Sequence, residues 1–96
     1  MSAVSPLGLT RVLMSGKASA GASADYSPQS INHSVQVVGT FIGVVVVEAS
    51  NDRVNWSPIG VAITVGGIQN ITGAYKYLRL NVTSFTSGSI TATMYE

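Results

Sequence analysis

The sequence offers few residues that could perform catalysis. A serine-type hydrolase needs a nucleophile, a base and an orienting acid that the fold brings together. His33 is the single histidine, and it stands between Asn32 and Ser34 at the start of an expected strand. A lone histidine in that setting is more often a surface or hydrogen-bonded residue than a general base. Because no serine lies in a Gly-x-Ser-x-Gly elbow, we expect that the protein is not an enzyme.

The acidic residues do not predict a catalytic or metal centre either, since no two of them form the close pair that a glycosidase needs. They are Asp25, Glu48, Asp52 and Glu96. Asn51, Asp52 and Asn55 could supply oxygen ligands to calcium, but Asn and Asp also favour turns. The chain has no cysteine, which removes thiolate sites, and Gly66-Gly67 lacks the context of a phosphate loop. We therefore expect no metal ion and no cofactor.

The most informative segment is residues 49–58, Ala-Ser-Asn-Asp-Arg-Val-Asn-Trp-Ser-Pro. Its Ser, Asn and Asp side chains can bond to the backbone, which predicts a hairpin turn. Trp56, the single tryptophan, could stack on a sugar ring, but a lid over the core edge is the more common role. We take five residues as the candidate binding loop: Asn51, Asp52, Arg53, Asn55 and Trp56.

Charge is scarce along the whole chain. Only 9% of the 96 residues are charged and the net charge is +1, against about 25% charged residues in a typical globular protein. The basic residues are scattered rather than clustered, so we expect no binding to nucleic acid. Interface cores are depleted of Lys, Glu and Asp, so a surface made largely of Ser, Thr, Asn and Gly favours self-association.

The longest apolar run is residues 41–47. It is far shorter than the roughly 20 residues that a membrane-spanning helix needs, so no membrane partner is expected. Within the run, the four valines at 44–47 place apolar groups on both faces of one strand. A central strand with a covered outer face and a subunit interface explain this pattern equally well.

Short β-branched runs separated by Gly, Asn and Ser dominate the chain after Pro28, a rhythm typical of an antiparallel sandwich. Leu78, Leu80 and Val82 alternate with polar residues, which predicts that they face the core. The sequence therefore predicts an all-β fold, a single antiparallel β-sandwich of jelly-roll-like type with an extended N-terminal arm. The expected strands are 34–40, 42–50, 59–65, 76–83 and 89–95.

Residues 1–30 are expected to form the N-terminal arm and linker, and residues 31–96 the sandwich body. The stretch 17–25 contains small residues without periodicity, which is typical of a flexible connector. Before it, the apolar cluster at 12–14 could form one short strand. A terminus of this composition is ordered only when something ties it down, so we expect the arm to lie along neighbouring subunits.

Three segments carry a resemblance to a known family. They are Ser-Asn-Asp-Arg-Val-Asn-Trp-Ser from Ser50, Tyr-Lys-Tyr-Leu-Arg-Leu-Asn-Val-Thr from Tyr75, and Gly-Ser-Ile-Thr-Ala-Thr from Gly88. In this order, across residues 35–96, they resemble small β-sandwich virion proteins of tailed bacteriophages. The Ser-Asn-Asp-x-x-Asn-Trp hairpin is also similar to that of discoidin-type carbohydrate-binding sandwiches, which are longer domains. Arg53 stands where the family usually has Gly, which leaves the turn type open.

The resemblance implies a structural virion protein, and the short chain with its arm looks most like a capsid decoration (cement) protein. Such a protein is expected on the capsid surface of the virion after synthesis in the host cytoplasm. Its expected partners are the major capsid protein and copies of itself, in a homo-oligomer for which a trimer is the leading expectation. The alternative is a tail or fibre component with a carbohydrate-binding module that uses the candidate loop.

Overall fold

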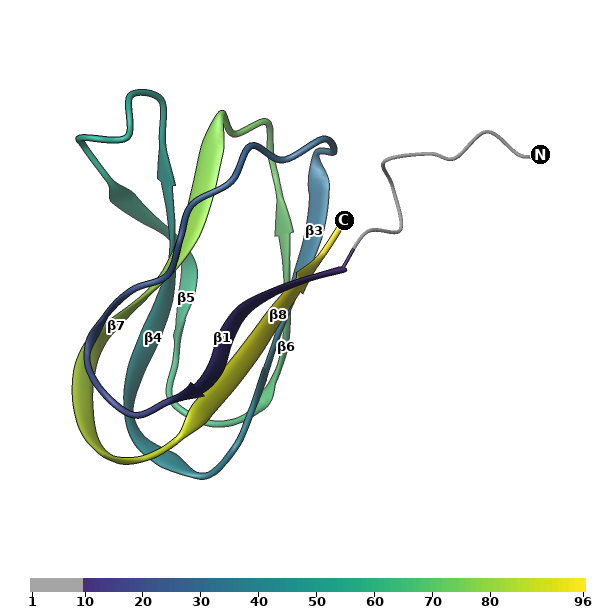
Figure 1. The fold of residues 1–96 in the computed structure, drawn as a ribbon. Helices are drawn as coiled ribbons and strands as arrows, with labels where there is room; N and C mark the ends of the chain where they lie inside the picture. Colours follow the sequence, from purple (N-terminus) through teal and green to yellow (C-terminus); the bar gives the residue numbers. More distant parts are fainter. Residues whose placement is uncertain (1–9) are drawn as a thin grey trace.

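A computed structural model describes residues 10–96, which form eight β-strands in two facing sheets (Figure 1). The strands are β1 (Thr10–Lys17), β2 (Gly21–Ala22), β3 (Asn32–Val38), β4 (Phe41–Ser50), β5 (Ser57–Ile63), β6 (Gly67–Thr72), β7 (Tyr77–Gly88) and β8 (Ile90–Tyr95). The predicted all-β sandwich is confirmed. The five expected strands correspond to β3, β4, β5, β7 and β8, although β7 continues well past its expected end.

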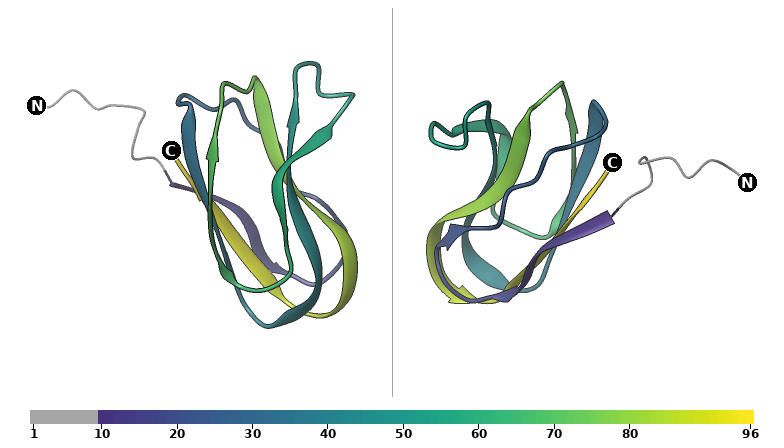
Figure 2. Two further views of the ribbon diagram at one scale, coloured as in Figure 1. Left: turned by 180° about the vertical axis from the view of Figure 1, so that it is seen from behind. Right: turned by 45° about the horizontal axis from the view of Figure 1, so that its top comes forward.

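The strand order is that of a jelly roll. Sheet A has the order β1-β8-β3-β6 and sheet B the order β2-β7-β4-β5, with every paired strand antiparallel. This alternation of early and late strands within each sheet is the arrangement of two interlocked Greek keys. The loops 27–31, 51–56 and 73–76 all lie at one end of the sandwich, which we call the loop end (Figures 1 and 2).

The core lies between the sheets, where the alternating pattern predicted it. Leu78 and Leu80 are 0% exposed and Val82 is 1% exposed, so the predicted inward face of β7 is confirmed. The alternate residues of β8 and β3 are buried opposite them. These are Ile90, Ala92 and Met94 on β8, and Val35 and Val37 on β3.

The valine run in β4 serves both faces of its sheet. Val45 and Val47 are fully buried in the core, while Val44 and Val46 point outward and are half-buried. The outward side of β4 lies between the neighbouring strands β5 and β7. The structure thus confirms the central position of β4 in sheet B, with Val44 and Val46 partly exposed on its outer face.

The expected boundary between an arm (1–30) and a body (31–96) does not hold for the described residues. Strand β1 is paired with β8 in sheet A, and β2 is paired with β7 in sheet B. Tyr26 then bridges to Leu78 through two backbone hydrogen bonds of 2.9 and 3.0 Å, and both Met14 and Tyr26 belong to the core. The short strand expected around 12–14 is confirmed as part of β1, whereas residues 1–9 lie outside the described residues.

Strand β6 was not expected, and one of its side chains joins the two sheets. The Gln69 amide accepts a hydrogen bond from Val61 N (3.2 Å) and donates one to Val61 O (2.9 Å), as the backbone of a neighbouring strand would. Val61 lies where β5 leaves its regular pairing with β4. Gly60 has φ 74°, and a Cβ at this position would collide with Gln69 Oε1. The glycine and the amide therefore act together to close this edge.

The place of β1 in the core can be tested with two lysine substitutions on the same strand. Met14 is 4% exposed and Val12 is 65% exposed. We expect Met14→Lys to lower the free energy of unfolding by about 3 kcal/mol or more, because it creates a packing defect and desolvates an ammonium group. Val12→Lys should change it by less than about 0.5 kcal/mol. Urea titrations followed by circular dichroism measure both values. Two equally small effects would show that β1 does not contribute to the core.

The edge closure by Gln69 gives a second stability prediction. Gln69→Ala removes both hydrogen bonds from the exposed Val61 backbone. Because water can take their place, we expect a loss of about 0.5–1.5 kcal/mol. Thr86→Ala, which replaces an exposed side chain on β7, is the control and should cost less than about 0.5 kcal/mol. The same urea titrations apply. A Gln69→Ala variant as stable as the control would show that the two hydrogen bonds do not support the fold.

Candidate functional site

The hairpin loop 51–56 is held by a network around Ser50 and Asp52. Ser50 Oγ accepts hydrogen bonds from Asp52 N (3.1 Å) and Arg53 N (2.9 Å) and donates one to Asp52 Oδ1 (2.9 Å). Asp52 Oδ1 also accepts from Val54 N (2.9 Å) and Asn55 N (2.8 Å), and Oδ2 accepts from Asn55 Nδ2 (2.8 Å). The predicted hairpin is therefore a preorganised loop whose polar side chains bond mainly to one another.

These bonds change the acidity of Asp52. Backbone donors from Asn55 and Val54, followed by the side chains of Asn55 and Ser50, hold the pKa of the Asp52 carboxyl well below its usual value. They favour the ionised form, since each donor points at a carboxylate oxygen. Asp52 and Asn55 thus shape the loop, which is the role that turn preference alone predicts for them.

Arg53 connects the hairpin to a distant segment. Its φ of 63° lies in the left-handed region that favours glycine, in agreement with the glycine that the resembling family has there. The guanidinium lies 4.1 Å from the centre of the Tyr77 ring, and its Nε is 3.1 Å from Asp25 Oδ1. These contacts compensate for the unfavourable backbone conformation and bind the loop to the chain that follows β2.

Trp56 does not form a lid over the core. It is half-buried, and the Arg79 guanidinium lies 4.1 Å from the centre of its ring. Arg79 Nε also donates a 2.8 Å hydrogen bond to Glu48 Oε1, and Asn81 Nδ2 donates one of 3.2 Å to Glu48 Oε2. Trp56 is therefore part of a charged cluster on sheet B, with one face of its indole covered by an arginine.

Two adjoining grooves lie at the loop end, and the residues of the candidate binding loop differ in whether they border them. Asn51 borders both grooves, Asp52 and Asn55 border one, and Arg53 and Trp56 border neither. The groove beside loop 27–31 measures about 520 Å³ and is lined by Pro28, Gln29, Ser30, Ile31, Asn51, Ala74, Tyr75 and Lys76. The groove under the hairpin measures about 390 Å³ and is lined by Ala49, Ser50, Asn51, Asp52, Asn55, Ser57, Ala74 and Tyr75.

Tyr75 is the residue that sequence reasoning missed, because it forms a wall shared by both grooves. Its hydroxyl donates a 3.3 Å hydrogen bond to Thr72 O, and its ring centre is 6.1 Å from that of His33. Gly73 has φ 151°, and a Cβ there would press on the Tyr75 ring. In the sequence, Tyr75 only precedes the expected strand 76–83. Nothing there indicates that its side chain would lie between two loops.

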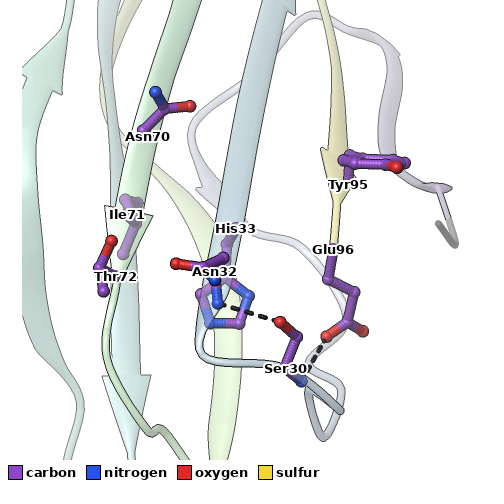
Figure 3. Close-up of a pocket in the computed structure, with 8 residues that line it drawn as sticks. All are labelled: Ser30, Asn32, His33, Asn70, Ile71, Thr72, Tyr95 and Glu96. Carbon is purple, nitrogen blue, oxygen red and sulfur yellow. Dashed lines mark hydrogen bonds between the residues drawn. The ribbon is translucent and has the colours of Figure 1, made fainter. Parts of the chain in front are cut away.

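A third pocket, of about 490 Å³, opens beside the first residues of β3 and the last residues of β6 and β8 (Figure 3). It is lined by Ser30, Asn32, His33, Asn70, Ile71, Thr72, Tyr95 and Glu96. His33 is only 4% exposed, with Nε2 3.4 Å from Gly73 O. Of the two roles expected for His33, surface or hydrogen-bonded, its burial and its contact with Gly73 O fit the second.

The Glu96 side chain, 0% exposed, connects three segments of the chain. It accepts hydrogen bonds from Gln29 N (2.7 Å) and Ser30 N (3.1 Å), and Arg11 Nη2 lies 3.4 Å from Oε1. The Arg11 guanidinium lies over the Tyr26 ring at 4.4 Å. Burial, followed by the Glu96 charge, raises the pKa of the Tyr26 hydroxyl above its usual value, against the opposite effect of Arg11. The cluster therefore fixes loop 27–31 against β1 and β8.

Neither a cluster of metal-ligating side chains nor a long apolar helix occurs among the described residues. Within 10–96 there is no group of three or more His, Cys, Asp or Glu residues placed to hold a metal ion. In the same part of the chain, no helix is long and apolar enough to cross a membrane.

The geometry defines the molecule as a jelly-roll sandwich with grooves at one loop end. No protein-family model matches the sequence, and no curated protein matches it either. Among solved structures, the chain is similar to the crystal structure of the SPBc2 prophage-derived protein YomS. The TM-score is 0.77 at 9% sequence identity, and the match covers 99% of this chain and 97% of that chain. At this identity the likeness establishes a shared fold.

The Asp52 network predicts a pH-dependent stability difference. Asp52→Asn places an amide donor opposite the Asn55 amide, so the variant should melt several degrees below the wild type at pH 7. Because the pKa of Asp52 is lower in the folded state, its stabilisation is complete above the unfolded pKa, about 3.9. It is lost as pH falls through the folded pKa. The gap between the two melting temperatures should therefore begin to close below about pH 4 and shrink further as pH falls toward the lower folded pKa, and a gap independent of pH would contradict an electrostatic role.

Proposed function

We propose that the protein is a structural component of a tailed-phage particle and acts there as a capsid decoration protein. The observation that carries this proposal is the fold likeness to a prophage-derived protein, which extends over nearly the whole of both chains. Jelly rolls are also the architecture of many viral capsid domains. The resemblance of the hairpin and of strands β7 and β8 to tailed-phage virion proteins points in the same direction.

The loop end is the surface that we assign to the major capsid protein. The hairpin projects from the sandwich (Figure 1), and the Asp52 network fixes its shape before any partner binds. A preorganised loop loses little conformational entropy on binding. Asn51 and Tyr75 lie between the two grooves, so a loop of a capsid subunit would contact both residues.

Attachment through the expected N-terminal arm and linker (residues 1–30) needs revision. Residues 10–25 include β1 and β2, which are paired within the two sheets. They therefore cannot extend along a neighbouring subunit while the sandwich stays folded. We retain the proposal of a homo-oligomer, with the trimer as the expectation from resemblance. In this form of the proposal the sandwich itself makes the contacts on the capsid surface of the virion.

The second candidate is a tail or fibre component that binds carbohydrate. Lectin domains include jelly rolls, and both loop-end grooves combine an aromatic wall, Tyr75, with the Asn51 amide. Trp56 of the candidate loop is less suited to this role, because Arg79 already covers one face of its ring. A sugar would therefore contact Tyr75, and a glycan array with the purified protein tests this alternative.

The decoration proposal is tested by adding the protein to capsids assembled without it. Wild-type protein should bind and raise the temperature of genome release, because it adds binding free energy to the closed shell. Asn51→Arg, which inserts a charged side chain between the grooves, should reduce the bound copies at least tenfold.

The matched control is Thr86→Arg, an exposed position near the opposite end of β7. It should bind as the wild type does, and circular dichroism should show both variants folded. Failure of the wild type to bind any capsid surface would overturn the decoration role, and equal binding by all three proteins would remove the loop end from it.

A further inference from the structure

The outer face of sheet A has no charged side chain. Its outward positions include Val12, Gln36, Val38, Ile68, Thr93 and Tyr95, and the remaining ones are Ser, Thr and Asn. Several large apolar groups are open to solvent: Val12 is 65% exposed, Ile68 66% and Tyr95 51%. A broad sheet face of this kind is unusual for a surface that remains in contact with water.

The charged residues lie elsewhere on the described chain. On sheet B, Glu48 and Arg79 form an outward ion pair at 2.8 Å, and Arg53 lies over the Tyr77 ring. Two cations belong to β1 of sheet A. The Arg11 guanidinium turns toward Tyr26 and Glu96, away from the outer face. Lys17 ends the strand opposite the buried Ile90, and its Nζ lies close to Gly21 of sheet B. The two outer faces of the sandwich therefore differ in character: one is charged and the other is neutral.

The strand register gives the neutral face a clear centre. Val12 pairs with Thr93, Thr93 with Gln36, and Gln36 with Ile68. These four side chains form one row across all four strands of sheet A. Gln36 is on an inner strand in this row, and its amide can both donate and accept hydrogen bonds.

We propose that two copies of the chain associate face to face through sheet A, around a twofold axis near Gln36. In a twofold contact each residue meets the same surface of the partner, so a charged face would bring like charges together. The face of sheet B has Arg53 and Arg79 and would incur this cost. The face of sheet A avoids it, and its Thr, Asn and Gln groups can bond to their own equivalents. This inference rests on the proposal that the protein acts by assembly, and it puts a twofold dimer in place of the trimer expected from the resemblance.

The size of the face limits the surface that a dimer can bury. From a strand spacing of about 4.8 Å and about 6.8 Å between outward residues, four strands with about three such residues each span roughly 400 Å². This is about half of the roughly 800 Å² that each partner contributes to a standard interface. We therefore expect a weak dimer with a dissociation constant in the micromolar range, which capsid binding would reinforce through multivalency.

Sedimentation equilibrium of the purified chain tests the contact through charge reversal at its centre. The wild type should dimerise as concentration rises. Gln36→Arg and Gln36→Glu should each weaken dimerisation at least tenfold, because identical charges meet at the axis. An equimolar mixture of the two variants should dimerise again, and Thr86→Arg should behave as the wild type. Circular dichroism melts establish that each variant is folded.

Each result bears on the proposal separately from the decoration role. A wild type that stays monomeric up to about 1 mM, or an oligomer that survives Gln36→Arg, overturns the sheet A contact, as does failure of the mixed variants to associate. Capsid binding is measured in parallel. If the wild type binds capsids without dimerising, only the sheet A contact fails; if it dimerises as described without binding capsids, only the decoration role fails.

Discussion

The antiparallel pairing of β4 with β7 is the constraint on which the rest of the molecule depends. It runs from Phe41 opposite Gly88 to Ser50 opposite Tyr77. The register places Val45, Val47, Leu78 and Leu80 on the inner face, where all are 0% exposed. A shift by one residue would turn this entire set toward water, so burial of the core also fixes which residues form the outer face.

The loop end follows from the same register. Because Glu48 pairs with Arg79, their side chains meet on the outer face of sheet B, and Arg79 is then in position to cover Trp56. One step farther, Ser50 ends β4 opposite Tyr77 and begins the hydrogen-bond network of the hairpin. The tyrosine ring supports Arg53 in its left-handed conformation. Core packing and loop geometry are therefore two consequences of one strand pairing.

Sequence reasoning succeeded where the signal is local. Alternation in β7 and β8 revealed the inward residues, and the Ser-Asn-Asp-x-x-Asn segment predicted a hairpin that forms through the bonds of Ser50 and Asp52. Sequence reasoning failed where an element contacts a strand or side chain far away in the chain. Strand β1 pairs with β8, at the far end of the chain, and its small-residue continuation has no period of its own. The role of Trp56 was missed for the same reason, since Arg79 reaches it from another strand.

The scarcity of charge has a structural explanation in how the few charges are used. Arg11 and Glu96 join β1 and loop 27–31 inside the fold, and Glu48, Arg53 and Arg79 fix the hairpin against sheet B. Removing one partner from such a pair leaves an uncompensated charge, so these residues are committed to structure. None of these residues lies on the outer face of sheet A. Recognition of a second copy there would depend on shape and on neutral hydrogen bonds around Gln36. A contact of that kind gains little from long-range attraction, so its specificity has to come from the close fit of one pleated surface on another.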